Sequence, residues 1–301
     1  MRVLVTGSKG QLVSALLKLR APGFTFFSAG RPGLDLAEPE SIARAIAEAR
    51  PDAVVNAAAY TAVDQAEAEP ELAERINGAG AGAVAEAAAK LGAPLIQLST
   101  DYVFDGTALA PHVETHPVNP RTVYGRSKLA GERASLAAHP GAVVLRTAWV
   151  YSPSGQNFPR TMLKLAASRD EVSVVNDQHG NPTAAADLAE AIAAILKNIG
   201  AAPDDQKLRG IFHCTGTGEA SWSDFAEEIF AVSRARGGPA ARVKRISTAD
   251  FAASRPGMAA RPKNSRLDCG KLARVHGISL PDWRKSVQGC VEKVLAGEQR
   301  T

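Results

Sequence analysis

The chain has 301 residues, of which 45% are hydrophobic and 22% charged, with 26 Gly and 18 Pro. This is the composition of a globular protein, and it excludes a peptide, a collagen, a coiled coil and a disordered chain. The 35 basic and 31 acidic residues give a net charge of +4 without any run of five like charges, so nucleic-acid binding is not expected.

Short aliphatic runs alternate with longer helical patterns in the first half of the chain. The runs lie at residues 3–5, 24–27, 53–56, 95–98 and 143–145, and each precedes a polar turn and a helix-like segment. Strands buried on both faces show no apolar-polar alternation. The pattern therefore predicts an α/β fold with a Rossmann-type, doubly wound parallel sheet over residues 1–150, with right-handed crossovers.

Loops bearing Pro, Gly and Asn become frequent after Trp149, as at residues 152–155 and 176–182. They predict a second, smaller α/β lobe over residues 151–301, which would bind the substrate. A helix near residues 183–198 is expected to pack back on the first domain. Residues 201–206 and 253–261 are expected to be surface loops.

Signals for export, membrane spanning and metal binding are not found in the sequence. Cys214, Cys269 and Cys290 form no CxxC pair, which indicates reduced thiols. No secretory signal and no apolar stretch of about 20 residues is recognised, so we expect a cytoplasmic protein outside the membrane. The six histidines show no ligand-like spacing such as HExxH, and metal catalysis is not expected.

A glycine pair in Gly7-Ser8-Lys9-Gly10 directly follows the first apolar run and opens a helical pattern. Free backbone N–H groups at the start of a helix favour a phosphate, so these residues predict a dinucleotide site. The spacing is GxxG instead of GxGxxG, and Val13 stands where a further glycine is usual. Val13 is expected to push the helix slightly off the sheet, and a plain tight turn is the alternative interpretation.

Arg31 follows the second apolar run, where NAD-specific sites carry an acidic residue for the ribose 2′-hydroxyl. A guanidinium group suits a 2′-phosphate, so the sequence favours NADPH over NADH, although NADH remains possible. The alternative is that Arg31 is a solvated surface charge.

Tyr124 and Lys128 are four residues apart, which places a phenol and an ammonium group on one side of a helix. A nearby cation favours the phenolate, so Lys128 is expected to bring the pKa of Tyr124 closer to neutral. Thr100 ends a predicted buried strand, at the sheet edge where such folds place their sites. Together the three side chains suit proton transfer to an alkoxide made by hydride delivery. A structural strand-end role for Thr100 and a chance Tyr-x-x-x-Lys pair are the alternatives.

Over nearly its whole length the chain resembles the dTDP-4-dehydrorhamnose reductase family of the extended short-chain dehydrogenase/reductases. The stretches that carry the resemblance are residues 3–11, 56–64, 99–106, 124–132, 146–151, 176–183 and 261–268. The resemblance implies an oxidoreductase of dTDP-rhamnose biosynthesis, a carbohydrate pathway. It would reduce the 4-keto group of dTDP-4-dehydro-L-rhamnose to dTDP-L-rhamnose, the last step in making this nucleotide sugar, with NADPH or NADH.

The resemblance also implies residue roles. Tyr124 matches the proton donor, Lys128 its partner and Thr100 the hydroxyl that polarises the keto oxygen. Matches to cofactor-contacting stretches are Gly10, Gln11, Leu12, Asp35, Leu36, Ala58, Ala59, Tyr60 and Thr61. Matches on the substrate side are Val63, Thr100, Asp101, Tyr124, Trp149, Arg261, Asn264 and Ser265. Core packing of Trp149 and a capping or turn role for residues 261–265 are the alternatives.

One departure from the family pattern concerns a metal. Ala15 stands where some members carry an acidic residue that helps a magnesium ion bridge two subunits, so magnesium is doubtful and a monomer or a homodimer is expected. Two other functions compete with this interpretation. One is a reductase or epimerase of another nucleotide sugar, and the other is a non-catalytic nucleotide-binding regulatory subunit.

Overall fold

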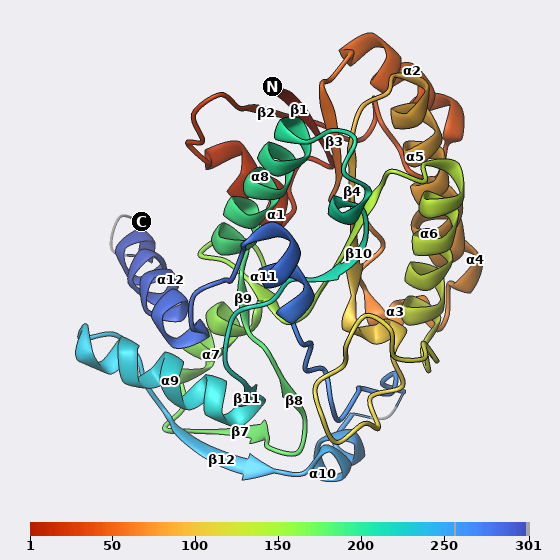
Figure 1. Cartoon of the computed structure of the whole chain (residues 1–301). Coiled ribbons are helices and arrows are strands. Elements are labelled where there is room, and N and C mark those ends of the chain that lie inside the picture. The colour runs from red at the N-terminus through yellow and green to blue at the C-terminus, as the bar shows by residue number, and fades with distance from the viewer. Residues whose placement is uncertain (256, 299–301) are drawn as a thin grey trace.

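A sheet of six parallel strands forms the centre of the computed structural model, which describes residues 1–255 and 257–298 (Figure 1). The strand order across the sheet is β10-β5-β4-β3-β1-β2. Their bounds are β1 (Arg2–Thr6), β2 (Thr25–Ala29), β3 (Ala53–Asn56), β4 (Leu95–Thr100), β5 (Val143–Thr147) and β10 (Gly210–His213). The predicted α/β fold with a parallel Rossmann-type sheet is confirmed.

Helices cover both faces of this sheet, which is why its strands carry apolar residues on both sides. Val3 and Val5 face one apolar cluster, whereas Leu4 between them faces another. The first face is covered by α1 (Gln11–Lys18), α8 (Ala185–Ala201) and α11 (Gly270–His276). The second is covered by α2 (Pro39–Ala49), α5 (Gly80–Lys90) and α6 (Val123–Ala138). We call the sheet with these helices the sheet domain.

The second half of the chain contributes more to the sheet domain than the one helix expected near residues 183–198. That helix is α8, which packs against α1, but strand β10 and helix α11 also belong here. Strand β10 pairs in parallel with β5, and His213 lies opposite Arg146.

The direction of winding reverses between β1 and β3. The chain runs from β1 to β2 at one edge and then returns to form β3 on the other side of β1. The loops that leave the carboxyl ends of two such strands diverge, and the crevice between them is where open α/β sheets bind ligands. The glycine loop after β1 and residues 57–61 after β3 line this crevice.

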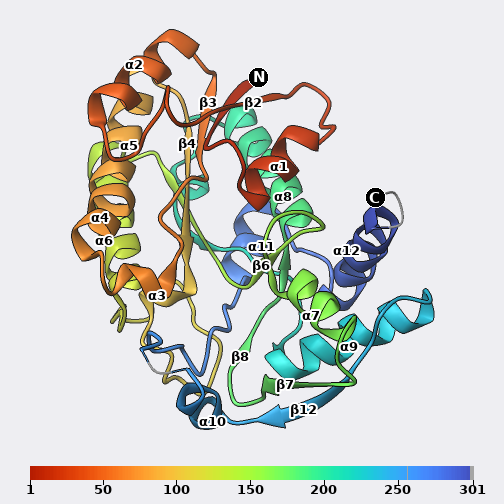
Figure 2. The same cartoon turned by 180° about the vertical axis from the view of Figure 1, so that it is seen from behind.

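The remaining elements form a smaller unit, called here the second lobe, at the carboxyl edge of the sheet (Figure 2). It contains β7 (Glu171–Val175), β8 (His179–Gly180), β11 (Ala220–Ser221), β12 (Arg242–Ile246), α7 (Phe158–Ala166), α9 (Trp222–Ala235), α10 (Thr248–Ala253) and α12 (Trp283–Glu298). Strands β7 and β12 pair in parallel, β8 and β11 antiparallel. Phe225, Ile229, Trp283 and Val291 lie at the centre of its core.

Shorter elements complete the chain. They are α3 (Val63–Ala66), α4 (Pro70–Glu74), η1 (Arg75–Ala79), η2 (Asp101–Val103), η3 (Gln206–Leu208), β6 (Val150–Tyr151) and β9 (Thr183–Ala184). Elements α4 and η1 pack against α6, and η3 packs against α8 and α11, so these three belong to the sheet domain. Strand β6, directly after Trp149, pairs with β9 and so joins the exit of β5 to the start of α8.

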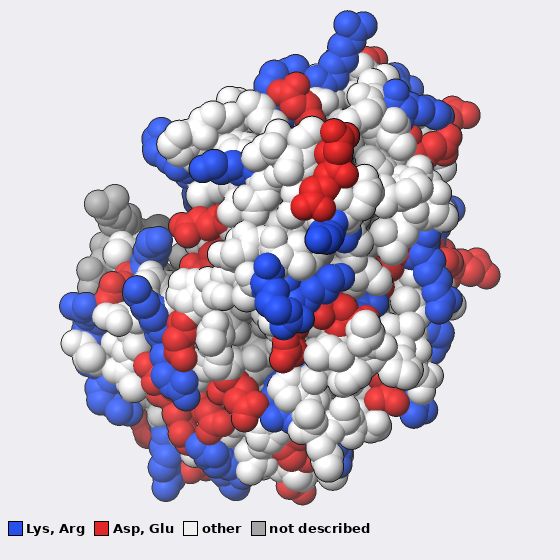
Figure 3. All heavy atoms as spheres, viewed as in Figure 1, with Lys and Arg blue, Asp and Glu red and all other residues white. Residues whose placement is uncertain are grey.

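The surface carries charges of both signs. On the face seen in Figure 3, Lys and Arg side chains lie among Asp and Glu side chains, with neutral areas between them. In the described part of the chain, no helix is both long enough and apolar enough to cross a membrane.

Candidate active site

The glycine loop after β1 forms an open backbone cradle. Gly7 has a φ of 95° and donates its N–H to Ala29 O at 2.7 Å, which ties the loop to the end of β2. A Cβ atom at Gly30 would lie 3.1 Å from the Gly7 carbonyl carbon and from the Ser8 nitrogen, so this close approach needs glycine. Gly10 begins helix α1 without a side-chain cap, which leaves the first N–H groups of α1 directed at the cradle.

The other predicted residues of this loop fall into two groups. Ser8 and Lys9 are exposed, whereas Leu12 is buried in the core, so that only its backbone faces the cradle. Val13, in place of the third glycine, is also buried, and a Cβ atom at Gly10 would lie 3.4 Å from its Cγ2, an ordinary van der Waals contact.

The Gln11 side chain forms hydrogen bonds that connect the sheet domain to the second lobe. Its Nε2 donates to Val150 O at 3.3 Å, and its Oε1 accepts from Asn157 Nδ2 at 3.0 Å. Asn157 is the N-cap of α7, so the start of the cofactor helix is joined to the second lobe by side-chain hydrogen bonds.

Arg31 lies at the rim of the cradle, two residues beyond the end of β2. Its side chain is exposed and makes no ion pair with any residue in 1–255 or 257–298. Asp35 is half-buried, and its Oδ1 accepts from Ala37 N at 3.0 Å in a local turn. Leu36 is buried in the core beneath this turn.

Residues 58–61 after β3 are held by buried polar side chains. Thr6 Oγ1 accepts from Ala58 N at 3.0 Å. Asn77 Oδ1 accepts from Tyr60 N at 2.8 Å, and its Nδ2 donates to Tyr60 O and to Ser127 Oγ, each at 3.0 Å. Asn77 lies in the π-helical turn η1 and is buried. It links the segment that carries Ala59 and Thr61 to helix α6.

The structure brings Thr100 and Tyr124 together at the end of β4. The Thr100 hydroxyl lies close enough to the Tyr124 phenol to lower its pKa, and Thr100 Oγ1 donates to Asp101 Oδ1 at 3.0 Å. The Tyr124 ring meets the Tyr102 ring edge-to-face, with 5.5 Å between the centroids. Lys128, one turn further along α6, is buried and donates from Nζ to Leu98 O on β4 at 2.7 Å.

The protonation of Tyr124 differs from the expectation. Burial raises its pKa to about 12, against the nearby Thr100 hydroxyl, which lowers it. The expectation that Lys128 draws this pKa towards neutral is wrong, because Lys128 Nζ is turned to a backbone carbonyl. Burial also lowers the pKa of Lys128 to about 8, while the nearby Glu132 carboxylate acts in the opposite direction. The Tyr124 phenol is therefore protonated at neutral pH.

Asp101 and Trp149 are the predicted substrate-side residues next to this trio. Asp101 is 3% exposed and accepts a hydrogen bond from Thr100 Oγ1. Burial raises its pKa to about 6, against the lowering effect of the nearby Ser265 and Thr100 hydroxyls. Its Oδ2 has no hydrogen-bond partner among the described residues. Trp149 follows β5 with a φ of 49°, and its indole is half-buried. Ser265 is the predicted residue that brings the second lobe to Asp101.

A loop of the second lobe that carries Arg261 reaches helix α3, which begins at Val63. Arg261 Nη2 pairs with the Asp64 carboxylate at 2.8 Å, and Asp64 Oδ1 accepts from Ala259 N at 2.9 Å. Val63, the first residue of α3, precedes Asp64. Arg261 retains 22% exposure of its side chain, so one cation from the second lobe is held at the rim of the sheet domain.

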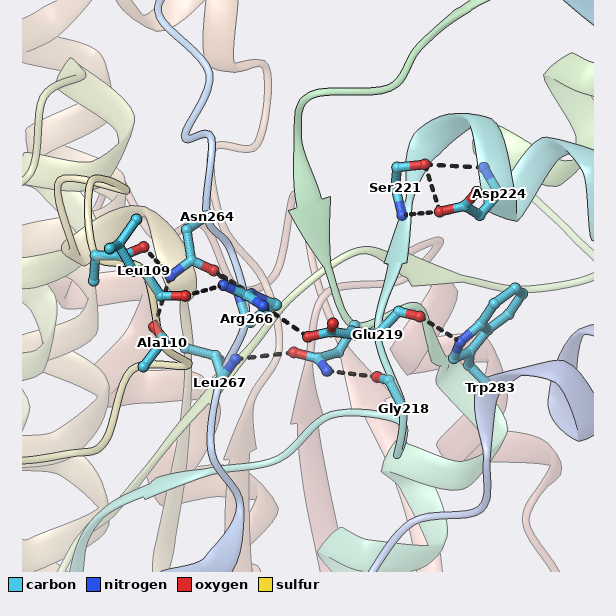
Figure 4. Close-up of polar contacts among 12 residues, drawn as sticks. Leu109, Ala110, Gly218, Glu219, Ser221, Asp224, Asn264, Arg266, Leu267 and Trp283 are labelled. Carbon is cyan, nitrogen blue, oxygen red and sulfur yellow. Dashed lines mark hydrogen bonds and ion pairs between the residues drawn. The ribbon is translucent and has the colours of Figure 1, made fainter. Parts of the chain in front are cut away.

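Asn264 takes no part in this rim, because its side chain is fully used within the fold (Figure 4). Its Nδ2 donates to Ala108 O and Ala110 O, both at 2.9 Å, while its Oδ1 accepts from Arg266 Nε at 2.8 Å. Arg266 in turn pairs with Glu219 at 2.8 Å. The structure thus favours the turn role that the sequence left open, and we correct the expected ligand contact of Asn264 to a structural one.

Three functional candidates were missed by sequence reasoning. Gly30 was invisible because its close approach to the glycine loop depends on strand pairing. Asn77 is a lone Asn next to an Ala-rich helical stretch, and this was the only signal that the sequence offered. Its burial is seen in the structure alone. Trp222 stacks on Trp149, and nothing in the local sequence indicates that contact. Within residues 1–255 and 257–298, no group of three His, Cys, Asp or Glu residues could hold a metal ion.

Comparison with known proteins gives a consistent family. The family model described as "RmlD substrate binding domain" matches residues 1–296. A dTDP-4-dehydrorhamnose reductase of Sinorhizobium fredii is 47% identical over 98% of both chains. The crystal structure of such a reductase from Clostridium acetobutylicum has a TM-score of 0.89 at 36% identity, covering 98% of this chain and 100% of that one. A Bacillus anthracis structure in complex with NADP has a TM-score of 0.85 at 36% identity, covering 95% and 97%. The chain belongs to the dTDP-4-dehydrorhamnose reductase family.

Proposed function

We propose that this chain reduces the 4-keto group of dTDP-4-dehydro-L-rhamnose to dTDP-L-rhamnose, with NADPH as the reductant. The observation that carries the proposal is the contact of Thr100 with Tyr124 at the carboxyl edge of the sheet, beside the glycine cradle. The names of the relatives support the substrate, and the NADP bound to the Bacillus anthracis protein supports the cofactor.

The residues present fit a dinucleotide. The cradle of Gly7, Gly10 and Gly30 presents backbone N–H groups and leaves no Cβ to obstruct a pyrophosphate. The exposed Arg31 suits a 2′-phosphate, which favours NADPH over NADH, and the Lys128 ammonium suits a ribose hydroxyl. When bound there, the cofactor supplies the hydride for C4 of the sugar.

The proton comes from Tyr124. With a pKa raised to about 12, its phenol is protonated at neutral pH and donates to the keto oxygen as C4 becomes tetrahedral. The C4–H bond would form as the cofactor's C–H bond breaks and the cofactor is oxidised. The O–H bond of the sugar forms as the Tyr124 O–H bond breaks, the C=O double bond becomes single, and the Tyr124 phenolate regains a proton from water. Thr100 Oγ1 turns from Asp101 to hydrogen-bond the keto oxygen. The Lys128 ammonium stabilises the transient phenolate.

We assign the sugar nucleotide to the space between the two units. Asp101, Trp149 and Val63 border the sheet-domain side of this space, and Ser265 and Arg261 approach it from the second lobe. Arg261 is suited to a phosphate of the nucleotide once it exchanges its contact with Asp64. Asn264 acts only by fixing the loop on which Ser265 lies.

We infer that the chain works as a monomer or as a homodimer without a magnesium bridge. Ala15, which stands where some family members have an acidic residue, packs against the core cluster between α1 and the sheet. A methyl group in that position offers no ligand to a cation.

The test is NADPH oxidation with enzymatically prepared dTDP-4-dehydro-L-rhamnose, followed by absorbance for the wild type and for Tyr124→Phe. The substitution removes the proton donor and keeps the ring, so turnover should fall by about 10²–10⁴-fold while the affinity for NADPH stays within about twofold. Tyr102→Phe is the matched control, because its ring contacts that of Tyr124, and it should keep near-normal turnover.

Two outcomes would contradict the proposal. Near-normal turnover of Tyr124→Phe would remove Tyr124 from the proton-transfer step. A wild-type chain that binds NADPH but oxidises it only with another nucleotide sugar would overturn the substrate assignment.

A further inference from the structure

Trp149 holds an unusual backbone conformation next to the reacting groups. Its φ is positive, at 49°. Among the described non-glycine residues, only Arg50 also has a positive φ, at 41°. A bulky side chain with positive φ is strained and persists only where its surroundings compensate. The indole Nε1 of Trp149 donates to no described residue, so its hydrogen-bonding edge is not used by the fold.

Trp222 supplies the compensating contact. The two indole rings are stacked, with 3.5 Å between centroids and 11° between planes. A face-to-face contact between two such large rings buries much of the apolar surface of both indoles. Because Trp222 belongs to α9 and Trp149 follows β5, the stack joins the second lobe to the sheet domain.

Gly180 limits the position of the Trp149 ring from another direction. A Cβ atom at Gly180 would lie 2.5 Å from Cε2 of Trp149, so any side chain there would displace the indole. Gly180 pairs with Ala220 across the β8–β11 ladder, and Trp222 follows two residues after Ala220. The β8–β11 pairing therefore fixes the distance between Gly180 and Trp222, two residues that contact Trp149.

Trp222 is itself held against rotation. Its Nε1 donates to Gln178 Oε1 at 3.1 Å, and the buried Gln178 donates from Nε2 to Thr248 Oγ1 at 3.0 Å. The Phe158 ring lies 4.7 Å from the Trp222 ring. The residue before Trp222, Ser221, forms a capping box with Asp224 that fixes the start of α9 (Figure 4).

We propose that Trp222 is a positioning residue, which with Gly180 holds the Trp149 indole in the orientation that contacts the sugar of the substrate. The inference rests on the proposed function, because it requires Trp149 on the substrate side. Trp222 does not touch the reacting atoms and acts only through Trp149. Replacing Trp222 should therefore lower kcat/KM for the sugar nucleotide and leave the affinity for NADPH almost unchanged.

The chain has 3 tryptophans, so the stack can be observed directly. Two indoles stacked face to face couple their transitions and give an exciton couplet in circular dichroism. The couplet should disappear in Trp222→Phe and Trp149→Phe and persist in Trp283→Phe, whose indole meets Phe225 at 83° instead. Gly180→Ala should weaken the couplet while all three indoles are kept.

The kinetic arm compares Trp222→Ala with Trp222→Phe. Loss of one aromatic stack should lower kcat/KM for the sugar nucleotide by about 2- to 10-fold, with KM for NADPH within about twofold. Trp222→Phe should restore part of the loss, because a smaller ring can still stack. Gly180→Ala should show the same selective loss, which provides a second variant if Trp222→Ala folds poorly.

A double-mutant cycle decides between positioning and an independent role. In a Trp149→Ala background, Trp222→Ala should lower kcat/KM by less than about twofold further. An equal loss in both backgrounds, or a lost couplet with unchanged kinetics, would overturn the proposal. So would a Trp149→Ala variant with normal kcat/KM. Absence of wild-type turnover with this sugar would instead be a failure of the proposed function, and the two failures are thus distinguishable.

Discussion

Replacing Asp101 with Asn should change how the stability of the protein depends on pH. The Asp101 side chain lies between Thr100 and Ser265 and is 3% exposed, and its Oδ2 has no partner among the described residues. Burial raises the pKa of this carboxyl group from 3.8 to about 6, against the lowering effect of the nearby Ser265 and Thr100 hydroxyls. The folded protein therefore holds a proton that the unfolded chain releases.

The sign and size follow from linkage. For an acid with a raised pKa in the fold, the stabilisation is fully present below pH 3.8 and is lost as the pH rises to and through about 6. With these two pKa values, the contribution falls by about 1–2 kcal/mol between pH 5 and pH 8. Asp101→Asn removes this fall. The new amide alters the absolute stability by an amount that does not vary with pH, so the slope is the diagnostic quantity.

The assay is urea unfolding of the wild type and the variant at several pH values from 5 to 8, at one ionic strength. Buried histidines act in the opposite direction: burial lowers the pKa of His213 to about 3, so its contribution falls as the pH drops below about 6.5. Taking the difference between variant and wild type cancels that effect. Asp105→Asn is the control, because hydrogen bonds from Thr107 lower the pKa of Asp105 and its titration lies below this range. A difference between Asp101→Asn and wild type that stays constant from pH 5 to 8 would refute the reasoning.

Three further results are expected. Because the pKa of Lys128 is lowered to about 8, kcat/KM should fall as the pH rises through about 8, and a profile that is flat to about pH 9.5 would contradict the assignment. Glu132→Gln leaves the Arg146 guanidinium buried without its ion pair and should cost about 3–5 kcal/mol in urea unfolding; a loss below about 1 kcal/mol would mean that Arg146 finds another partner. Arg31→Ser should raise KM for NADPH about tenfold and leave KM for NADH unchanged, and equal changes for both cofactors would make Arg31 a surface charge.

The sheet and its ligand-binding edge could be predicted because their signals are local. Parallel strands are buried on both faces, so runs such as Val3–Val5 and Ala53–Asn56 stand out as apolar segments. Glycines after the first run and a Tyr and Lys at helical spacing then indicate a cradle and a proton donor. Strand β10 was missed because Gly210–His213 is short and lies far along the chain from its neighbour β5, and no local pattern shows which sheet it joins.

The finer parts of the site depend on contacts between distant segments, which periodicity does not reveal. Arg261 pairs with Asp64, and the Asn264 amide donates to the carbonyls of Ala108 and Ala110, although Arg261 and Asn264 are both polar and could have faced a ligand. Motif matching placed Asn264 and Ser265 together, but the fold directs one side chain to a turn and the other to Asp101. The protonation of Tyr124 was misjudged for a related reason: burial, which sequence spacing does not measure, exceeds the effect of a nearby cation.

The placement of Tyr124 depends on two buried tethers between helix α6 and the sheet. One is the Lys128 ammonium on Leu98 O, and the other is the Glu132 carboxylate, which binds Arg146 of β5 through two hydrogen bonds of 2.8 and 2.7 Å and also accepts from Ser99 Oγ on β4. A buried ion pair contributes little net stability compared with apolar packing, because desolvation offsets the attraction. The directional hydrogen bonds of Glu132 nevertheless prevent helix α6 from sliding or rotating on strands β4 and β5. Since Tyr124 and Glu132 lie two turns apart on α6, a shift of the helix would separate the phenol from Thr100. The same polar residues that add little to folding therefore hold the Tyr124 phenol beside the Thr100 hydroxyl on β4.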